Sequence, residues 1–195
     1  MTTDPLKLDP LTSALLVMDF QTGIVAMVPS DADGLLQRTA AVIAAARKAS
    51  MRVLYVVVGF RAGYPEVSPA HPTFGAIRTT GRFVEGSAGS EIHAAVAPHA
   101  GDVIVTKHRV SAFAGTDLDM ILRANGIQTL VLAGIATSGV VLSTVRHATD
   151  ADYRVVVVSD CCADADAEVH RVLTEKVFAR ATTVVPSDAA VRAFG

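Results

Sequence analysis

Short apolar runs alternate with amphipathic stretches along the chain. The runs lie at residues 14–18, 53–58, 103–105, 130–133, 155–158 and 183–185 and consist mainly of Val, Leu and Ile. Most do not alternate with polar residues, which indicates strands buried on both faces, as in a parallel sheet. The stretches between them predict helices over 34–49, 118–124, 137–149, 167–179 and 188–194. This order predicts right-handed crossovers and a three-layer α/β/α sandwich in a single domain, residues 1–195.

One segment breaks this rhythm. Residues 59–89 contain six glycines and three prolines and are too long for a simple crossover loop. Loops of this length in a compact domain are often lids or binding loops. An irregular surface excursion explains the composition equally well, so both interpretations stay open.

Composition narrows the class of protein. Hydrophobic residues make up 51% of the 195-residue chain and charged residues 18%, which favours a sizeable core over disorder. The net charge of −2 and the absence of a basic run give no support for nucleic-acid binding. No apolar run approaches the ~20 residues of a membrane span, and the N-terminus lacks the pattern of a signal peptide. We therefore expect a soluble cytoplasmic α/β domain.

Polar residues follow several of the predicted strands. Asp19 ends the first, with Phe20 and Gln21 after it, and Lys107 ends the third. In an open parallel sheet the ligand crevice lies beyond the carboxyl ends of the strands. A carboxylate and an ammonium group there can face one crevice, and their pairing lowers the cost of burying either charge. The two residues together favour a site, although a single strand-end charge is more often structural.

Other motifs are incomplete. The stretch GIATSG has glycines spaced like a phosphate-binding loop, but valines stand where Lys and Ser or Thr are required. No GxGxxG or GxSxG motif occurs, and no two of the six histidines have metal-ligand spacing. Cys161 and Cys162 are adjacent, which is typical of small buried residues and not of a disulfide framework. We expect neither a metal nor a cofactor.

Several stretches in the same order resemble the isochorismatase-like superfamily of hydrolases, also called cysteine hydrolases. They are LLVMDFQ, FRAGYPEVSP, VTKHRVSAFAGTDLDMILRANGI, GIATSGVVLSTVRHA and VVVVSDCCAD. The resemblance covers nearly the whole chain and implies a six-stranded, mostly parallel sheet of order 3-2-1-4-5-6. It also implies a non-proline cis peptide at Ile135–Ala136 and a homo-oligomer, often a dimer or tetramer.

The resemblance assigns catalytic roles to an Asp, a Lys and a Cys. Asp19 and Lys107 match the first two. The position of the Cys, six residues after Gly134 and four before Thr144, is Val140. Family members that cleave isochorismate also lack the Cys, but they carry Gly there. Val140 is bulkier than Gly and would narrow the pocket, so isochorismate itself is not the expected substrate.

Three functional hypotheses follow. The first is hydrolysis by Asp19 and Lys107 without a cysteine nucleophile, with backbone N–H groups of the turn holding an anion. The second is amide hydrolysis with a displaced nucleophile, Thr137 or Ser138, although both residues are also natural helix N-caps. The third is an inactive small-molecule-binding protein of the same fold. The expected substrate- or oxyanion-binding residues are Phe20, Gln21, Ile135, Ala136, Thr137, Ser138 and Gly139.

The long segment offers further candidates for substrate contact. Arg61, Arg78 and Arg82 could meet a carboxylate, although a solvated face is the commoner role for such residues. Aromatic residues that could wall an apolar pocket are Phe20, Phe60, Phe74 and Phe113. Of these loop candidates, Arg61 and Phe113 are the contacts we favour.

Overall fold

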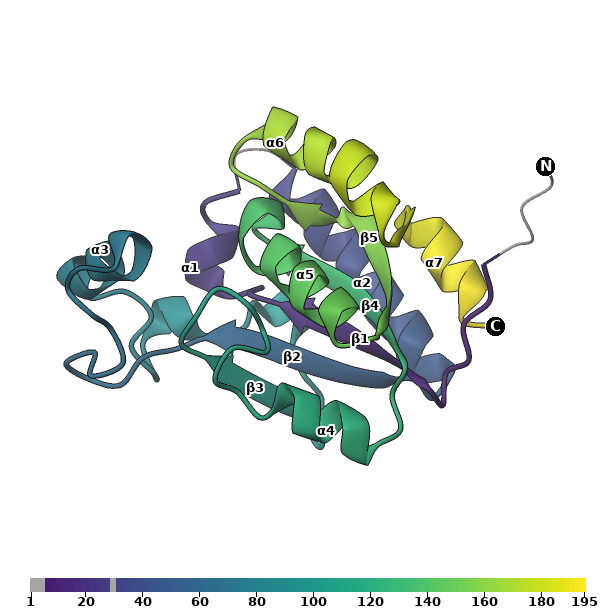
Figure 1. Ribbon diagram of the computed structural model, residues 1–195, viewed down its shortest axis with the longest axis horizontal. Coiled ribbons are helices and arrows are strands. Elements are labelled where there is room, and N and C mark those ends of the chain that lie inside the picture. The colour runs from purple at the N-terminus through teal and green to yellow at the C-terminus, as the bar shows by residue number, and fades with distance from the viewer. Residues whose placement is uncertain (1–5, 29–30) are drawn as a thin grey trace.

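The computed structural model describes residues 6–28 and 31–195, which form one six-stranded sheet with helices around it (Figure 1). The strand order is β3-β2-β1-β4-β5-β6, and every neighbouring pair is parallel. The predicted fold class and strand order are therefore confirmed. The strands are β1 (Ser13–Met18), β2 (Arg52–Val58), β3 (Val103–Lys107), β4 (Thr129–Ile135), β5 (Arg154–Ala163) and β6 (Thr183–Val185).

The helices connect these strands. They are α1 (Thr22–Val25), α2 (Ala32–Lys48), α3 (Pro72–Thr80), α4 (Leu118–Ala124), α5 (Leu142–Asp150), α6 (Ala167–Val172) and α7 (Ser187–Ala193). The predicted helix over 167–179 is only partly α-helical, because α6 passes into a wide turn at Leu173–Val177 and a tight one at Phe178–Arg180. The predicted helix over 137–149 likewise begins with a wide turn, Thr137–Val141, before α5.

Side chains that alternate along the strands build two separate cores. On one face, Leu15 and Val17 of β1 pack with residues of α2 and α7. On the other face, Leu16 and Met18 pack with residues of α4 and α5. Because each central strand is covered on both sides, its sequence is an unbroken apolar run, as expected for a parallel sheet.

The 59–89 segment leaves the end of β2 and projects from the sheet with α3 at its tip (Figure 1). His71 caps α3 by accepting a hydrogen bond from the Phe74 N–H, and Pro72 follows at the first helical position. Phe74 is buried, and its ring lies edge-on to Phe60 with 5.7 Å between ring centroids. Phe60 and Phe74 also belong to the core on the α2 side, so the segment is packed onto the rest of the molecule.

Candidate active site

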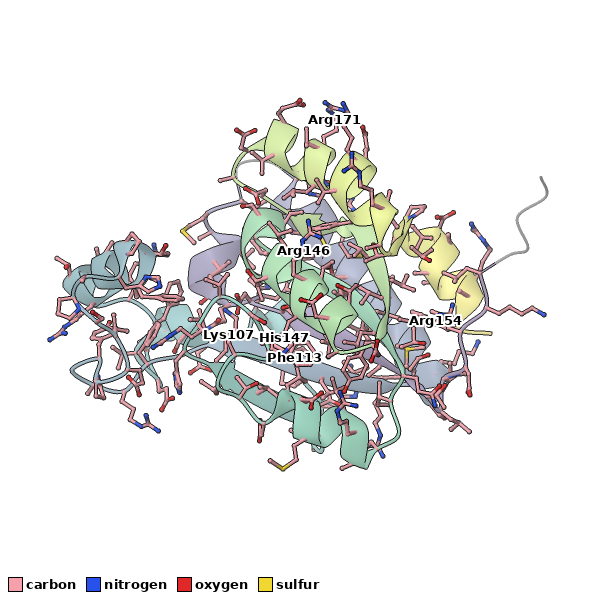
Figure 2. The ribbon with its side chains drawn as sticks, in the orientation of Figure 1. Lys107, Phe113, Arg146, His147, Arg154 and Arg171 are labelled. Atoms are coloured by element: carbon pink, nitrogen blue, oxygen red, sulfur yellow. The ribbon has the colours of Figure 1, made fainter. Side chains whose placement is uncertain are left out.

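The carboxyl ends of β1 and β3 bring Asp19 and Lys107 together. Lys107 is the last residue of β3, Asp19 follows β1, and β2 lies between the two strands. Lys107 Nζ lies 2.9 Å from Asp19 Oδ2, and the two side chains are only 4% and 7% exposed. Nζ also donates a hydrogen bond to the Arg109 carbonyl oxygen at 3.2 Å. Figure 2 shows Lys107 between the projecting segment and α5.

The electrostatics of Asp19 suit proton transfer. Burial raises the pKa of the Asp19 carboxyl, and this effect outweighs the Lys107 ammonium and the Val58 backbone N–H, which both lower it. Asp19 Oδ1 is buried and accepts no hydrogen bond from the described residues. A protonated carboxyl has lower desolvation cost in such a place than a carboxylate. One oxygen is thus held by Lys107, and the other is available for a substrate or water.

Asp19 and Lys107 share a cavity of about 260 Å³ with the turn that follows β4. Val140 lines this cavity and is 3% exposed. The other lining residues are mostly apolar. They are Ile24, Met27, Val28, Val58, Thr73, Phe74, Ile77, Phe83, Val110, Ile135, Ala136, Gly139, Asp164 and Ala165.

The turn after β4 has an irregular backbone. The Ile135–Ala136 peptide bond is cis, at the position that the family resemblance implies. Gly139 has φ −97° and ψ −105°, outside the helical region, within the wide turn Thr137–Val141. Near the end of β4, Gly134 is closely packed, since an added Cβ would lie 3.0 Å from Val141 Cγ2 and 3.2 Å from Met18 Cβ, so these neighbours would have to shift by a few tenths of an ångström.

Three of the turn's backbone N–H groups are already bonded within the protein, and one of them, that of Val141, donates to the Ala136 carbonyl oxygen at 3.3 Å. The Ser138 N–H donates to Asp164 Oδ2 at 2.7 Å, and the Gly139 N–H donates to the Ala136 carbonyl oxygen at 3.1 Å. The N–H groups of Ser138, Gly139 and Val140 were the expected anion holders, and those of Ser138 and Gly139 are already in use in this structure. The Asp164 carboxylate, and not a substrate, accepts the hydrogen bond of the Ser138 N–H.

Thr137 and Ser138 do not line the cavity. The Thr137 side chain is buried, and its Oγ1 lies 2.8 Å from His170 Nδ1 of α6. Burial lowers the pKa of His170, although the Asp164 carboxylate opposes this effect. The pair has the composition of a hydroxyl and a base, but it lies outside the residues that surround Asp19 and Lys107. Ser138 is exposed to solvent. The structure thus gives no support to a hydroxyl nucleophile at this cavity.

Gln21 and Phe20 have structural contacts. The Gln21 side-chain amide donates to the carbonyl oxygens of Val58 and Ser90 at 2.9 and 2.8 Å, and its oxygen accepts from the Val58 N–H. Gln21 therefore joins the end of β2 to the long segment with its hydrogen-bonding groups in use. Phe20 belongs to the core on the α2 side. Neither residue lines the cavity, contrary to the sequence-based expectation.

The favoured loop contacts also lie elsewhere. Arg61 pairs with Glu66, and Phe113 stacks on His147 of α5 with 4.6 Å between ring centroids (Figure 2). Of the four candidate phenylalanines only Phe74 lines the cavity, together with Phe83, which sequence reasoning missed. Sequence reasoning also missed Asp164 and Met27. Asp164 directly follows β5, but that strand continues past the apolar run 155–158, so the run gave no signal for Asp164.

The cysteines lie within β5 and not after it, because that strand continues to Ala163. Both thiols are buried and free. Burial raises the pKa of Cys161 to about 12 and that of Cys162 further. Thiols in such surroundings are poor nucleophiles. Among the described residues no cluster of His, Cys, Asp and Glu could hold a metal ion, and no helix is long and apolar enough to cross a membrane.

The buried Asp–Lys pair at the carboxyl edge of the parallel sheet opens on a cavity of small-molecule size, and sequence comparison identifies the family. Residues 13–189 match the isochorismatase domain model. The chain belongs to the isochorismatase family and is a hydrolase.

Individual relatives agree with this assignment. The chain is 36% identical over 178 residues to a ureidoacrylate amidohydrolase of Variovorax paradoxus, an alignment that covers 80% of this chain and 71% of the relative. An isochorismatase family protein of Burkholderia thailandensis has a similar structure, with a TM-score of 0.84, 31% identity and coverage of 97% and 98% of the two chains. N-carbamoylsarcosine amidase of Thermoplasma acidophilum is 32% identical with a TM-score of 0.72, over 91% of this chain and 97% of that one.

Proposed function

We propose that this chain hydrolyses a small molecule by proton transfer through Asp19, without a covalent enzyme intermediate. The observation that carries the proposal is the buried Asp19–Lys107 pair, which opens on a cavity where Val140 replaces the family's nucleophilic cysteine. The names of two relatives, an amidohydrolase and an amidase, favour a C–N bond as the one cleaved. A vinyl ether is the alternative substrate class, because the family members that lack the cysteine cleave isochorismate, which is a vinyl ether.

The chemistry needs only Asp19, Lys107 and water. Protonated Asp19 gives its proton to the substrate, and the resulting carboxylate is stabilised by the Lys107 ammonium 2.9 Å away. Water then attacks the activated carbon, a C–O bond forms and the C–N bond breaks. The nitrogen leaves with the proton that Asp19 gave, and a proton of the water returns to Asp19. One water molecule is consumed, and the enzyme is unchanged. The raised pKa of Asp19 supports the donor role, because a general acid must be protonated near the working pH.

The test is turnover of a panel of small amides and vinyl ethers by the wild type and by Asp19→Asn. The amide side chain keeps the shape of Asp19 but transfers no proton, so we expect a loss of roughly 100-fold or more. Asp188→Asn is the matched control, since Asp188 pairs with Arg192 on the exposed face of α7. Undiminished turnover by Asp19→Asn would contradict the mechanism. Ligand binding without turnover of any member would favour the binding-protein alternative.

The proposal also places the protein in the cytoplasm as a homo-oligomer, a dimer or tetramer. The family resemblance supports the assembly. Light scattering at micromolar concentration tests it, and a monomer would contradict it.

A further inference from the structure

Charge is scarce in the cavity that contains Asp19. Among its lining residues the charged ones are Asp19, Lys107 and Asp164. The single cation, Lys107, is bonded to Asp19 and to the Arg109 carbonyl oxygen. With Asp19 protonated the three groups carry no net charge, and with Asp19 ionised the net charge is negative. In neither state does the cavity have positive charge left over for an anionic ligand.

The nearby arginines do not change this balance. Arg61 pairs with Glu66, and Arg78 donates to the Val67 carbonyl oxygen at 3.3 Å. Arg82 donates to the Gly23 carbonyl oxygen at 3.0 Å, contacts Met27 Sδ at 3.2 Å and lies over the Phe83 ring. Its side chain is exposed and does not line the cavity. Within the described part of the chain, no guanidinium group lines the cavity.

The remaining wall is apolar and the space is small. Side chains from four separate parts of the chain form it: Met27 after α1, Phe74 and Ile77 of α3, Val110 after β3, and Val140 in the turn. Its volume of about 260 Å³ is just below the ~300–1,000 Å³ of sites for drug-sized ligands. A compact apolar group fits such a wall, whereas a carboxylate buried there would lose its hydration without gaining a partner.

We propose that this cavity selects an uncharged substrate with a short branched or aromatic apolar group, and that Asp164 excludes carboxylate-bearing molecules. The substrate class is thus a neutral aliphatic or aromatic amide. This inference rests on the proposed function for the reaction, but it concerns which molecules enter the site.

The position of Asp164 fits that role. It follows β5, where the pairing of Ile135 with Ala163 sets the strand beside the end of β4. Asp164 Oδ2 accepts from the Ser138 N–H at 2.7 Å, and Oδ1 lies 3.4 Å from the Asp166 N–H. These bonds hold the carboxylate at the cavity wall. Asp164 is half-buried, and a second carboxylate placed beside it would be repelled.

A matched pair of ligands tests the inference. Isovaleramide and malonamate have nearly the same shape, but an isopropyl group in the first takes the place of the carboxylate in the second. Binding is measured by NMR titration of methyl-labelled methionines, because Met27 lines the cavity and Met120 is 71% exposed on α4. We expect isovaleramide to shift the Met27 signal and to bind at least about tenfold more tightly than malonamate. Met120 should not respond.

Two variants test whether the charge of Asp164 causes the preference for isovaleramide over malonamate. Asp164→Asn keeps an acceptor for the Ser138 N–H and removes the charge, so malonamate should bind about threefold to tenfold more tightly while isovaleramide is little changed. Asp188→Asn makes the same change in net charge at a remote surface and should leave the preference unaltered. Preferred binding of malonamate by the wild type, or failure of both ligands to perturb Met27, would overturn the inference. Preferred binding of isovaleramide without ammonia release would support it while contradicting the proposed amide hydrolysis.

Discussion

Replacing Lys107 by Met tests how strongly the buried pair is coupled. Met is close to Lys in length and apolar, so the substitution removes the charge and leaves little empty space. Over the whole residue, backbone included, Lys107 and Asp19 are 3% and 5% exposed. Oδ1 of Asp19 has no hydrogen-bond donor among the described residues. Loss of Lys107 therefore leaves a buried carboxyl whose main ionic partner is gone. Breaking a buried pair in this way costs about 3–5 kcal/mol when the surviving group is charged.

The loss of stability in Lys107→Met should depend on pH, because Asp19 is uncharged once it is protonated. Burial already raises the pKa of Asp19, and Lys107 opposes this, so the variant's pKa lies higher still. A carboxyl with a raised folded-state pKa is fully compatible with folding below its unfolded pKa, about 3.9, and destabilises as pH rises through the folded value. The deficit of Lys107→Met should thus be small near pH ~5 and approach ~3–5 kcal/mol near pH ~8.

Urea unfolding followed by far-UV circular dichroism measures the free energy of unfolding at both pH values. Lys48→Met, at the exposed end of α2, is the control and should change it by less than about 0.5 kcal/mol. Adding Asp19→Asn to Lys107→Met should recover stability at the higher pH, because no buried charge then remains. A deficit that is the same at both pH values, or as small as that of Lys48→Met, would refute the reasoning.

Three further predictions concern the turn and its surroundings. Val140→Cys should lower the free energy of unfolding by less than ~1.5 kcal/mol, since the two residues are similar in size. It should also add a release of ammonia from amides that iodoacetamide abolishes. Absence of iodoacetamide-sensitive turnover would contradict this prediction. Stability should fall as pH drops below about 6.5, because burial lowers the pKa of His170 and the unfolded chain takes up that proton first; a pH-dependent comparison of unfolding with His170→Gln, which should show a shallower fall, checks this. Cys161 and Cys162 should react with a thiol reagent only after urea is added, since burial raises both pKa values; rapid labelling of the folded protein would show that β5 opens.

The sequence is sufficient to predict Asp19 and Lys107 because one simple rule places them. Buried parallel strands read as apolar runs, and their carboxyl ends meet at one edge of the sheet. Any polar residue that directly ends such a run is therefore brought to that edge. β1 and β3 lie on either side of β2, so predicting that Asp19 and Lys107 lie close together requires the strand order as well. The family resemblance supplied that order.

The rest of the site depends on side-chain direction and on strand length, which the sequence pattern does not fix. Gln21 is two residues from Asp19, yet its side chain turns to Val58 and Ser90. Asp164 reaches the cavity only because β5 runs five residues beyond the apolar run, past a register shift between Leu132 and Gly134 of β4. Met27 and Phe83 come from loops, where no periodicity indicates which way a side chain points.

The turn after β4 shows why the side chain at position 140 can differ while the turn keeps its place. Two flanking side chains bond to the turn: Asp164 accepts from the Ser138 backbone N–H, and His170 bonds to the Thr137 side-chain hydroxyl. Neither contact involves the side chain at position 140. Val140 packs within the apolar core on the α5 side and also faces the cavity. A change at this position therefore alters the chemistry and shape of the cavity, whereas the placement of the turn is maintained by β5 and α6.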